Sequence, residues 1–439
     1  MFIDDMNGIA VARPTACGVR TAAAQCRVQV QAFDLGLAAL AATLIPVSLI
    51  WDFSWESTIG VDRFWSPPHL TTHIGVWLCG LLGARLVFVF TLTHHQGGSV
   101  SGVNIGGFCG PSGAWILLWG AVVMQAALLL DNWWQQAYGL GAGLWPPPQI
   151  LKAIGFFTLL FGGVVLCAGA RGHGVASRRT MAAVLLHWQG GLLLTMCAVV
   201  LTMLNYPNWQ HTAGFYKISC AIYPAVLLGT GTGATGRWGA TYTALVYMAI
   251  VCALVWLLPL FPARPLTAPI HNPTDHMMPP AFPLLLVVPA VVMDWLRGRS
   301  VLLPGCEAAT NQPTPNPSQE GNNPSCAAPL LGGGRGGFKR TNRELWVAVT
   351  AGTCFVAAFV PVQWFFAKFL LSPGTDNWFF AGGGRHWPFF LKIDQARTAF
   401  WGVKQEPLTW QAALLAMLFA GVSSWIGLRV GTWLSKLRR

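Results

Sequence analysis

Two histidines four residues apart, preceded by three acidic residues, are the side chains of this sequence best suited to chemistry. His69 and His73 lie in the stretch WDFSWESTIGVDRFWSPPHLTTHIG, and their spacing places both on one face of a helix that starts at the prolines. In the first turns of that helix, the dipole favours neutral imidazole, which is the form that binds metals. The acids that could complete a metal site or orient the imidazoles are Asp52, Glu56 and Asp62.

Further ligands could come from other loops that are expected on the same side of the membrane. These residues are His211, His271, Asp275, His276, Met277, Met278 and His386. Imidazole and carboxylate together suit copper, zinc or iron, and nearby methionine would favour copper. The sequence also allows two other roles: hydrogen bonds that hold the loops together at a wet interface, and binding of a proton or a substrate.

The composition is that of a membrane protein. Of the 439 residues, 54% are hydrophobic and 10% are charged, whereas soluble proteins carry about 25% charged residues. Runs of about 20 apolar residues predict membrane-spanning helices, and no alternating pattern predicts a barrel. We therefore expect an all-α polytopic transmembrane bundle of about ten spans in the lipid bilayer, at 32–50, 70–92, 112–130, 149–170, 180–203, 215–232, 239–261, 280–296, 345–371 and 409–432.

The net charge is +12, and the Lys and Arg residues are distributed along the chain in the way that orients membrane proteins. We therefore expect no nucleic-acid partner. Lys and Arg concentrate in the segments that lie inside if the N-terminus is inside. This bias predicts that both termini lie in the cytoplasm and that the histidine site faces the opposite side. That side is the periplasm if the chain is a bacterial inner-membrane protein, as the family resemblance given below implies. The eleven cysteines avoid the outer loops, which argues against structural disulfides.

The chain divides where its composition changes. Segment 304–343 is rich in Pro, Gly, Asn and Ser and is expected to be a disordered, inserted cytoplasmic loop. The other expected units are a cytoplasmic tail at 1–31, helical hairpins at 32–92 and 107–171, central helices at 180–300 and C-terminal helices at 344–439.

The two hairpins carry a parallel internal repeat, because LDNWWQQAYGLGAGLWPPPQILKAIG in the second aligns with the stretch in the first. The matching pairs are Asp52 and Asp131, Trp55 and Trp134, Gly60 and Gly139, and Trp65 and Trp145. The positions of His69, His73, Glu56 and Asp62 hold Gln149, Ala153, Gln135 and Gly141 in the second copy. We therefore expect the first copy to keep the chemistry and the second to be structural.

Pairs of prolines predict where helices start. Ser66 is expected to cap the helix that starts at Pro67 and Pro68, because proline tolerates the first turn, where its missing amide costs nothing. A weaker echo of the repeat, HNPTDHMMPPAFPLLL, predicts that Pro279 and Pro280 open another helix.

These motifs resemble an uncharacterised family of bacterial multi-pass membrane proteins. The resemblance rests on D-x-x-W followed by SPPH, and on DNWWQQAYGL, PPAFPLLLVVPAVVMDWL and FAKFLLSPGTDNWFF. It covers most of residues 33–300 and part of 360–380, and it implies a multi-pass helical fold with no established activity. It also implies a histidine in both copies of the repeat, and this sequence departs from that pattern at Gln149.

Two further features bear on function. The motif GPSGAW resembles the nucleophile motif of rhomboid proteases, and His187 could form a dyad with Ser112, although Ser112 could equally cap a helix. Charged side chains within spans are costly and often functional. Of these, Arg85 is the deepest, Lys152 is expected to extend outward to water, and Asp294 is expected to pair with basic neighbours.

The first functional expectation is a membrane protein with a periplasm-facing metal site in an oxidative or respiratory role. Copper is the first metal expected, and zinc or iron the second. One alternative is a proton-coupled transporter that uses the same acids and histidines. Another is a structural subunit that binds other membrane subunits, and a rhomboid-like serine protease is a more remote alternative.

Overall fold

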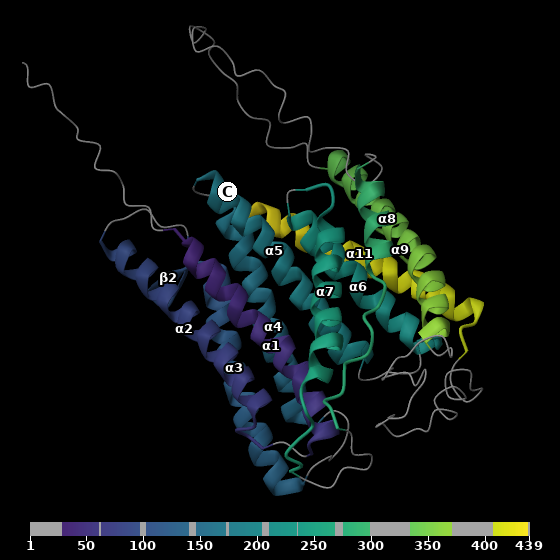
Figure 1. The fold of residues 1–439 in the computed structure, drawn as a ribbon. Helices are drawn as coiled ribbons and strands as arrows, with labels where there is room; N and C mark the ends of the chain where they lie inside the picture. The colour runs from purple at the N-terminus through teal and green to yellow at the C-terminus, as the bar shows by residue number, and fades with distance from the viewer. Residues whose placement is uncertain are drawn as a thin grey trace, which may run out of the picture.

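The computed structural model describes residues 29–60, 63–96, 102–139, 146–172, 175–203, 210–234, 236–267, 275–298, 334–370 and 407–437. Within these ranges the chain forms a bundle of helices and one short antiparallel hairpin (Figure 1). The elements are α1 (Ala32–Thr58), α2 (Pro67–His95), β1 (Val103–Ile105), β2 (Phe108–Gly110), α3 (Ser112–Tyr138), α4 (Pro147–Ala170), α5 (Ala176–Cys197), α6 (Ala213–Gly233), α7 (Gly239–Leu257), α8 (Val287–Gly298), α9 (Gly334–Leu370) and α11 (Trp410–Lys436).

Each apolar run that was predicted to span the membrane overlaps one of these helices. In the described ranges, eight helices are long and apolar enough to cross a membrane, and α6 and α8 are not among them. The chain is therefore a helical membrane protein with several spans, and the number of ten stays a prediction.

The helices form two groups that meet at α5. In the first group α1 packs on α2, α2 on α3, and α3 on α4; in the second, α11 packs on α6 and α9, and α8 packs on α7 and α9. Because α5 contacts α1 and α4 as well as α6 and α7, it joins the groups. The start of α1 and the end of α11 lie at one end of the bundle, here called the terminal end (Figure 1). The opposite end, where α1 and α3 finish, is called the loop end.

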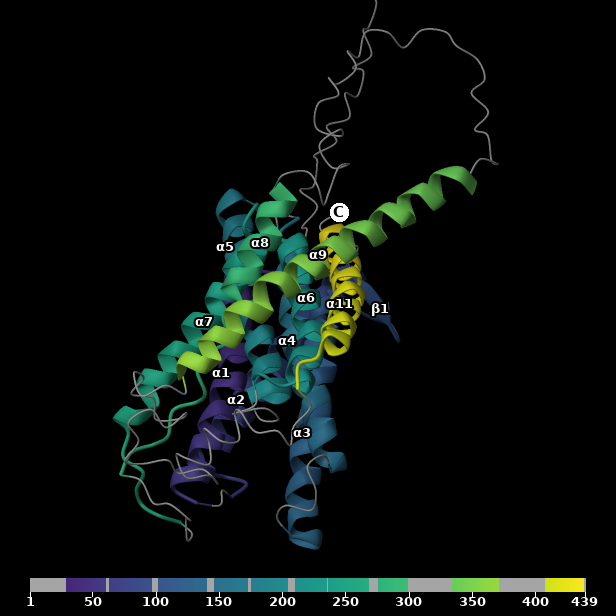
Figure 2. The same cartoon turned by 90° about the vertical axis from the view of Figure 1, so that its right-hand side faces the viewer.

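Small residues let the helix backbones approach closely. At Gly113 of α3, an added Cβ would lie 2.6 Å from the Cα of Leu166 in α4. At Gly427 of α11, it would lie 2.7 Å from the carbonyl oxygen of Ala225 in α6. The Ser423 hydroxyl of α11 accepts the N–H of Ala225 at 2.9 Å, which adds a polar tie to this contact. Figure 2 shows α11 beside α6 and α9. Membrane helices associate through such packing, since lipid leaves little hydrophobic driving force between them.

The helix predicted at 280–296 is shorter than expected, and Pro279 and Pro280 do not open it. The chain is non-helical through residues 277–286, and α8 begins only at Val287. A third proline, Pro283, follows the pair. Proline lacks an amide hydrogen and disfavours the helical conformation of the residue before it. Three prolines this close together therefore delay the start of the helix.

Side chains of two helices satisfy the backbone of this non-helical segment. The N–H of Leu284 donates to the hydroxyl of Tyr247 in α7 at 2.8 Å. The N–H of Leu285 donates to Oε1 of Gln363 in α9 at 3.0 Å. Gln363 in turn donates from Nε2 to Oε1 of Gln210 at 2.7 Å, and all three donor and acceptor side chains are buried. In apolar surroundings an unpaired backbone group is costly, so Tyr247 and Gln363 make this course of the chain possible.

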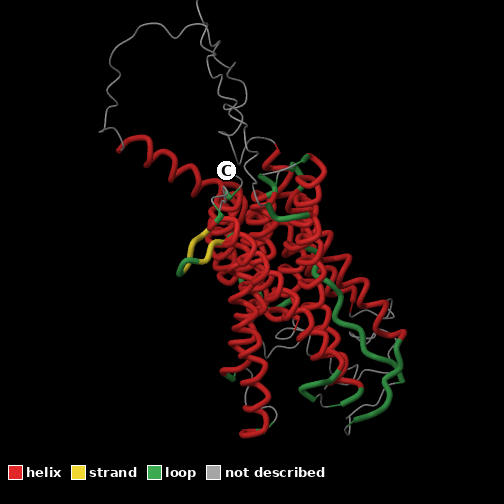
Figure 3. Tube along the Cα trace, turned by 90° about the vertical axis from the view of Figure 1, so that its left-hand side faces the viewer, coloured by secondary structure: helices red, strands yellow, loops and turns green. Residues whose placement is uncertain are grey.

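The described parts of the loop that follows α7 lie along one side of the bundle at the loop end (Figure 3). Pro262 and His276 form an antiparallel bridge within it. The N–H of Thr267 donates to the carbonyl oxygen of Ile59, at the end of α1, at 2.8 Å. This loop therefore connects the second group of helices with the first.

Candidate functional site

Helices α1 and α2 bring four of the predicted site residues to the loop end. Asp52 and Glu56 lie in the last two turns of α1, and His69 and His73 lie in the first two turns of α2. As predicted, α2 begins at the proline pair that follows Ser66. The Ser66 hydroxyl nevertheless makes no hydrogen bond to the first amides of the helix.

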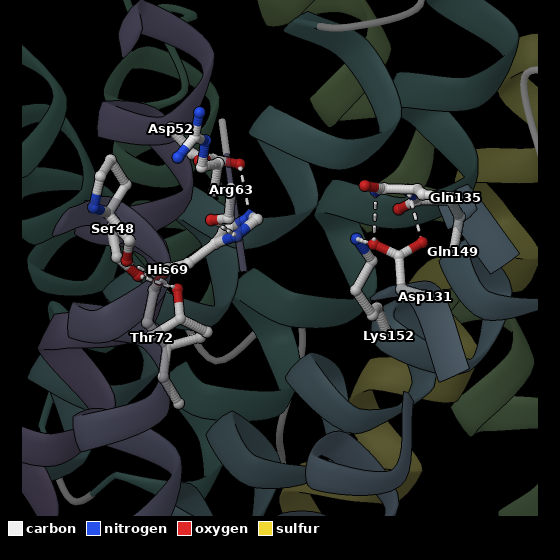
Figure 4. Close-up of polar contacts among 11 residues, drawn as sticks. Ser48, Asp52, Arg63, His69, Thr72, Asp131, Gln135, Gln149 and Lys152 are labelled. Atoms are coloured by element: carbon white, nitrogen blue, oxygen red, sulfur yellow. Dashed lines mark hydrogen bonds and ion pairs between the residues drawn. The ribbon is translucent and has the colours of Figure 1, made fainter. Parts of the chain in front are cut away.

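Asp52 and His69 face each other between the two helices (Figure 4). His69 Nε2 lies 3.5 Å from Asp52 Oδ2, and both side chains are mostly buried. His69 Nδ1 lies 3.1 Å from the carbonyl oxygen of Arg63. A carbonyl oxygen only accepts hydrogen bonds, so Nδ1 carries a hydrogen. The second nitrogen, Nε2, then either holds another proton or presents a lone pair to the carboxylate.

His73 belongs to a different environment from His69, although both lie on α2. Its buried ring is surrounded by the rings of Phe64, Trp65 and Trp77, with centroids 4.8, 5.4 and 5.9 Å away. His73 Nδ1 lies 3.4 Å from the side-chain amide of Gln125 in α3. The Trp77 indole donates to the same amide at 2.9 Å. His73 thus packs toward α3 and not toward the Asp52 carboxylate.

The additional ligands predicted from other loops lie in several places. His211 packs edge-on to Trp364 of α9, with ring centroids 5.8 Å apart, and burial lowers the pKa of His211 to about 4. Its imidazole is therefore neutral at physiological pH. Asp275 and His276 are exposed in the loop after α7, where Asp275 Oδ1 lies 3.9 Å from Arg264 Nη2.

The described residues contain no group of three or more His, Cys, Asp or Glu side chains placed to hold a metal ion. Three of the predicted ligands, Asp62, His271 and His386, lie outside the residues that the structure describes. Glu56 is exposed one turn after Asp52 on α1. Asp52 and His69 are therefore the pair of predicted ligands that the structure brings together.

The second hairpin holds a cluster of polar side chains around Asp131 of α3. Lys152 Nζ lies 2.8 Å from Asp131 Oδ2, and Gln135 Nε2 donates to the same oxygen at 3.1 Å. Gln149 Nε2 donates to Asp131 Oδ1 at 3.3 Å. Asp131 is buried, so the ammonium group and the two amides together replace the water that would otherwise solvate the carboxylate.

The clusters of the two hairpins make corresponding contacts (Figure 4). Asp52 meets His69 across α1 and α2, and Asp131 meets Gln149, at the aligned positions, across α3 and α4. Lys152 does not extend outward to water as expected but pairs with Asp131. The pair could have been predicted from the alignment of the two hairpins. That alignment places Asp131 opposite Gln149, and Lys152 lies in the same turn of α4 as Gln149.

The other charged side chains near the spans also have partners. Arg85 pairs through Nη1 with the buried carboxylate of Asp34, at the start of α1. Asp294 of α8 pairs with Arg297 at 3.3 Å, as expected, and accepts the N–H and the hydroxyl of Thr241 at 2.8 Å each. Both carboxylates lie toward the terminal end, where these contacts hold helix termini together.

A rhomboid-like protease would require a hydrogen bond between Ser112 and His187. Both residues are described, and they form no such bond with each other. His187 of α5 lies beside the ring of Tyr242 in α7, with centroids 5.5 Å apart. Ser112 is the first residue of α3, after Pro111 at the cap position. A protease function stays a prediction that no contact here supports.

These observations define the chain as a polytopic helical membrane protein with polar clusters inside its bundle. Comparison with protein-family models, with curated proteins and with solved structures finds no match. The resemblance to the family of bacterial multi-pass proteins therefore stays a prediction.

Proposed function

We propose that this membrane protein binds a cation between Asp52 and His69 at the loop end. The observation that carries the proposal is the separation of His69 Nε2 and Asp52 Oδ2, which is 3.5 Å. Two ligands that each bind a tetrahedral metal at about 2.1 Å lie about 3.4 Å apart. The contact of His69 Nδ1 with the Arg63 carbonyl is also the kind of hydrogen bond that orients an imidazole for metal binding.

The proposed ligand set is smaller than the one expected from the sequence. Asp52 and His69 are its centre, and Glu56 and Asp62 are the nearest acids along the chain that could add oxygen ligands. His73 is left out, because aromatic rings surround its imidazole and its polar side-chain partner is Gln125 of α3. Copper is the first metal proposed on affinity, since it binds imidazole most tightly among divalent first-row ions. Zinc, whose tetrahedral geometry fits the 3.5 Å separation, or iron is the second. A copper ion would fit an oxidative or respiratory role.

The metal content of detergent-purified protein tests this proposal. After reconstitution, the wild type is expected to hold about one ion per chain, and His69→Gln less than about a tenth of that. Glutamine is a suitable replacement because Gln149 occupies the aligned position and contacts Asp131. His211→Gln is the matched control and is expected to keep the metal. Mass spectrometry of the eluted metals gives the readout.

The same measurement separates the alternatives. A wild-type protein that holds no copper, zinc or iron after reconstitution would reject the metal proposal. A protonated His69 facing Asp52 would suit a proton-coupled transporter equally well, so proton flux into vesicles that His69→Gln abolishes would then favour transport. Other membrane subunits that co-purify without metal would favour a structural role.

We further propose that the terminal end faces the cytoplasm of a bacterial inner membrane and that the cation site faces the periplasm. The distribution of Lys and Arg supports this orientation. A fluorescent protein fused after α11 is expected to fluoresce, and alkaline phosphatase fused there is expected to be inactive. Alkaline phosphatase inserted between α3 and α4 is expected to be active. The reverse pattern would place the cation site in the cytoplasm.

A further inference from the structure

Among the described residues of the loop end, Asp131 is the most buried carboxylate. Its two oxygens receive the ammonium group of Lys152 and the amide groups of Gln135 and Gln149 at 2.8, 3.1 and 3.3 Å. The side chains of Asp131 and Lys152 are only 7% and 15% exposed. A buried carboxylate stays ionised only if a positive charge and hydrogen-bond donors replace its water. The donors come from two helices, so they form a site rather than a single surface ion pair.

The first hairpin lacks an ammonium group at the aligned position. Thr72 stands where the second hairpin has Lys152, and the Thr72 hydroxyl bonds to the Ser48 hydroxyl at 2.7 Å instead of reaching the carboxylate. Figure 4 shows the two arrangements side by side. The second hairpin therefore carries an ammonium group at the position where the first hairpin carries a hydroxyl.

We propose that the Asp131 carboxylate, held in place by the amides of Gln135 and Gln149, is a second cation-binding site, in which the ammonium group of Lys152 is the resident cation. Its ligand class is a small univalent cation with N–H donors, such as ammonium or methylammonium, which binds when the Lys152 side chain is shortened. The comparison with Asp52 rests on the proposed function, but the site at Asp131 and its test do not.

Shortening Lys152 to alanine in the full chain tests the proposal. The Lys152→Ala variant leaves Asp131 buried without its cation, so its thermal unfolding midpoint is expected to fall by on the order of 5 °C. Methylammonium chloride is expected to restore at least about half of that loss by binding in the space left by the side chain. Tetramethylammonium chloride, which has no N–H donor, and sodium chloride at equal ionic strength are expected to restore little.

The double variant Asp131→Asn with Lys152→Met is the matched control, because it removes both charges and keeps the volumes. It is expected to melt within about 2 °C of the wild type and to ignore methylammonium. The proposal is overturned if Lys152→Ala melts like the wild type, if all three salts restore it equally, or if the double variant also responds. Because the readout is the melting midpoint, a missing metal site at Asp52 would leave this result unchanged.

A variant that fails to fold still decides the question. If Lys152→Ala yields no folded protein, it is produced again in medium that contains methylammonium. Folded protein obtained only under that condition supports the proposal. A double variant that folds while methylammonium fails to recover Lys152→Ala overturns it.

Discussion

Replacing Gln363 with methionine is expected to lower the free energy of unfolding by about 2–6 kcal/mol. The substitution leaves two buried polar groups without their hydrogen-bond partner, and each such group costs about 1–3 kcal/mol. The groups are the N–H of Leu285 and Oε1 of Gln210, which Gln363 bonds at 3.0 and 2.7 Å. Methionine has a similar length and fills the same space, so loss of packing contributes little. Unfolding of the purified protein in mixed detergent micelles measures the change.

Tyr247 provides an independent check of the same segment. Tyr247→Phe removes the acceptor of the Leu284 N–H and is expected to cost about 1–3 kcal/mol. Tyr242→Phe is the matched control on α7, where the side chain is 51% exposed, and its effect is expected to stay within about 0.5 kcal/mol. Equal effects of the two tyrosine substitutions would show that the backbone of the segment does not depend on Tyr247.

Replacing Gly113 with alanine is expected to destabilise the protein by about 1–3 kcal/mol, because α3 and α4 have to separate to admit the methyl group. The added carbon would lie 2.6 Å from the Cα of Leu166, and backbone atoms yield less easily than a side chain. Gly169→Ala on α4 is the control, since nothing lies within 4 Å of its added carbon. That substitution is expected to be neutral or to stabilise by about 0.5–1 kcal/mol through helix propensity.

The close contact at Gly113 also explains the glycine of the GPSGAW motif. The glycine of GPSGAW is Gly113, and its contact with α4 accounts for a small residue there without any nucleophile at Ser112. If Gly113→Ala unfolds at the same detergent concentration as the wild type, the close approach of the two helices is incorrect.

Apolar runs in the sequence were sufficient to predict the helices, because long hydrophobic stretches in lipid have few alternatives to a helix. The prediction from apolar runs was wrong at residues 277–286, which are not helical. Hydrophobicity there is high, but three prolines prevent a helix, and the partners of its backbone come from Tyr247 and Gln363, which are distant in the sequence. No local pattern reports partners that lie on other helices.

The candidate site was predictable only in part for a similar reason. The spacing of His69 and His73 correctly places both near the start of α2, but it does not say what each ring meets across the helix interface. The structure sets Asp52 against His69 and Gln125 against His73. Lys152 was misjudged because its position near a helix start suggested contact with water, whereas its partner lies 21 residues earlier on α3.

During synthesis the spans reach the bilayer in chain order, and each enters most readily when its own backbone hydrogen bonds are complete. Residues 277–286 cannot complete theirs alone, because the N–H of Leu285 requires Gln363 of α9, which the ribosome delivers later. With 12 residues, α8 is about 18 Å long and is too short to cross a hydrocarbon core of about 30 Å unaided. The segment between α7 and α9 can therefore complete its hydrogen bonds only after α9 has been made. We expect α7, α8 and α9 to reach their final positions together.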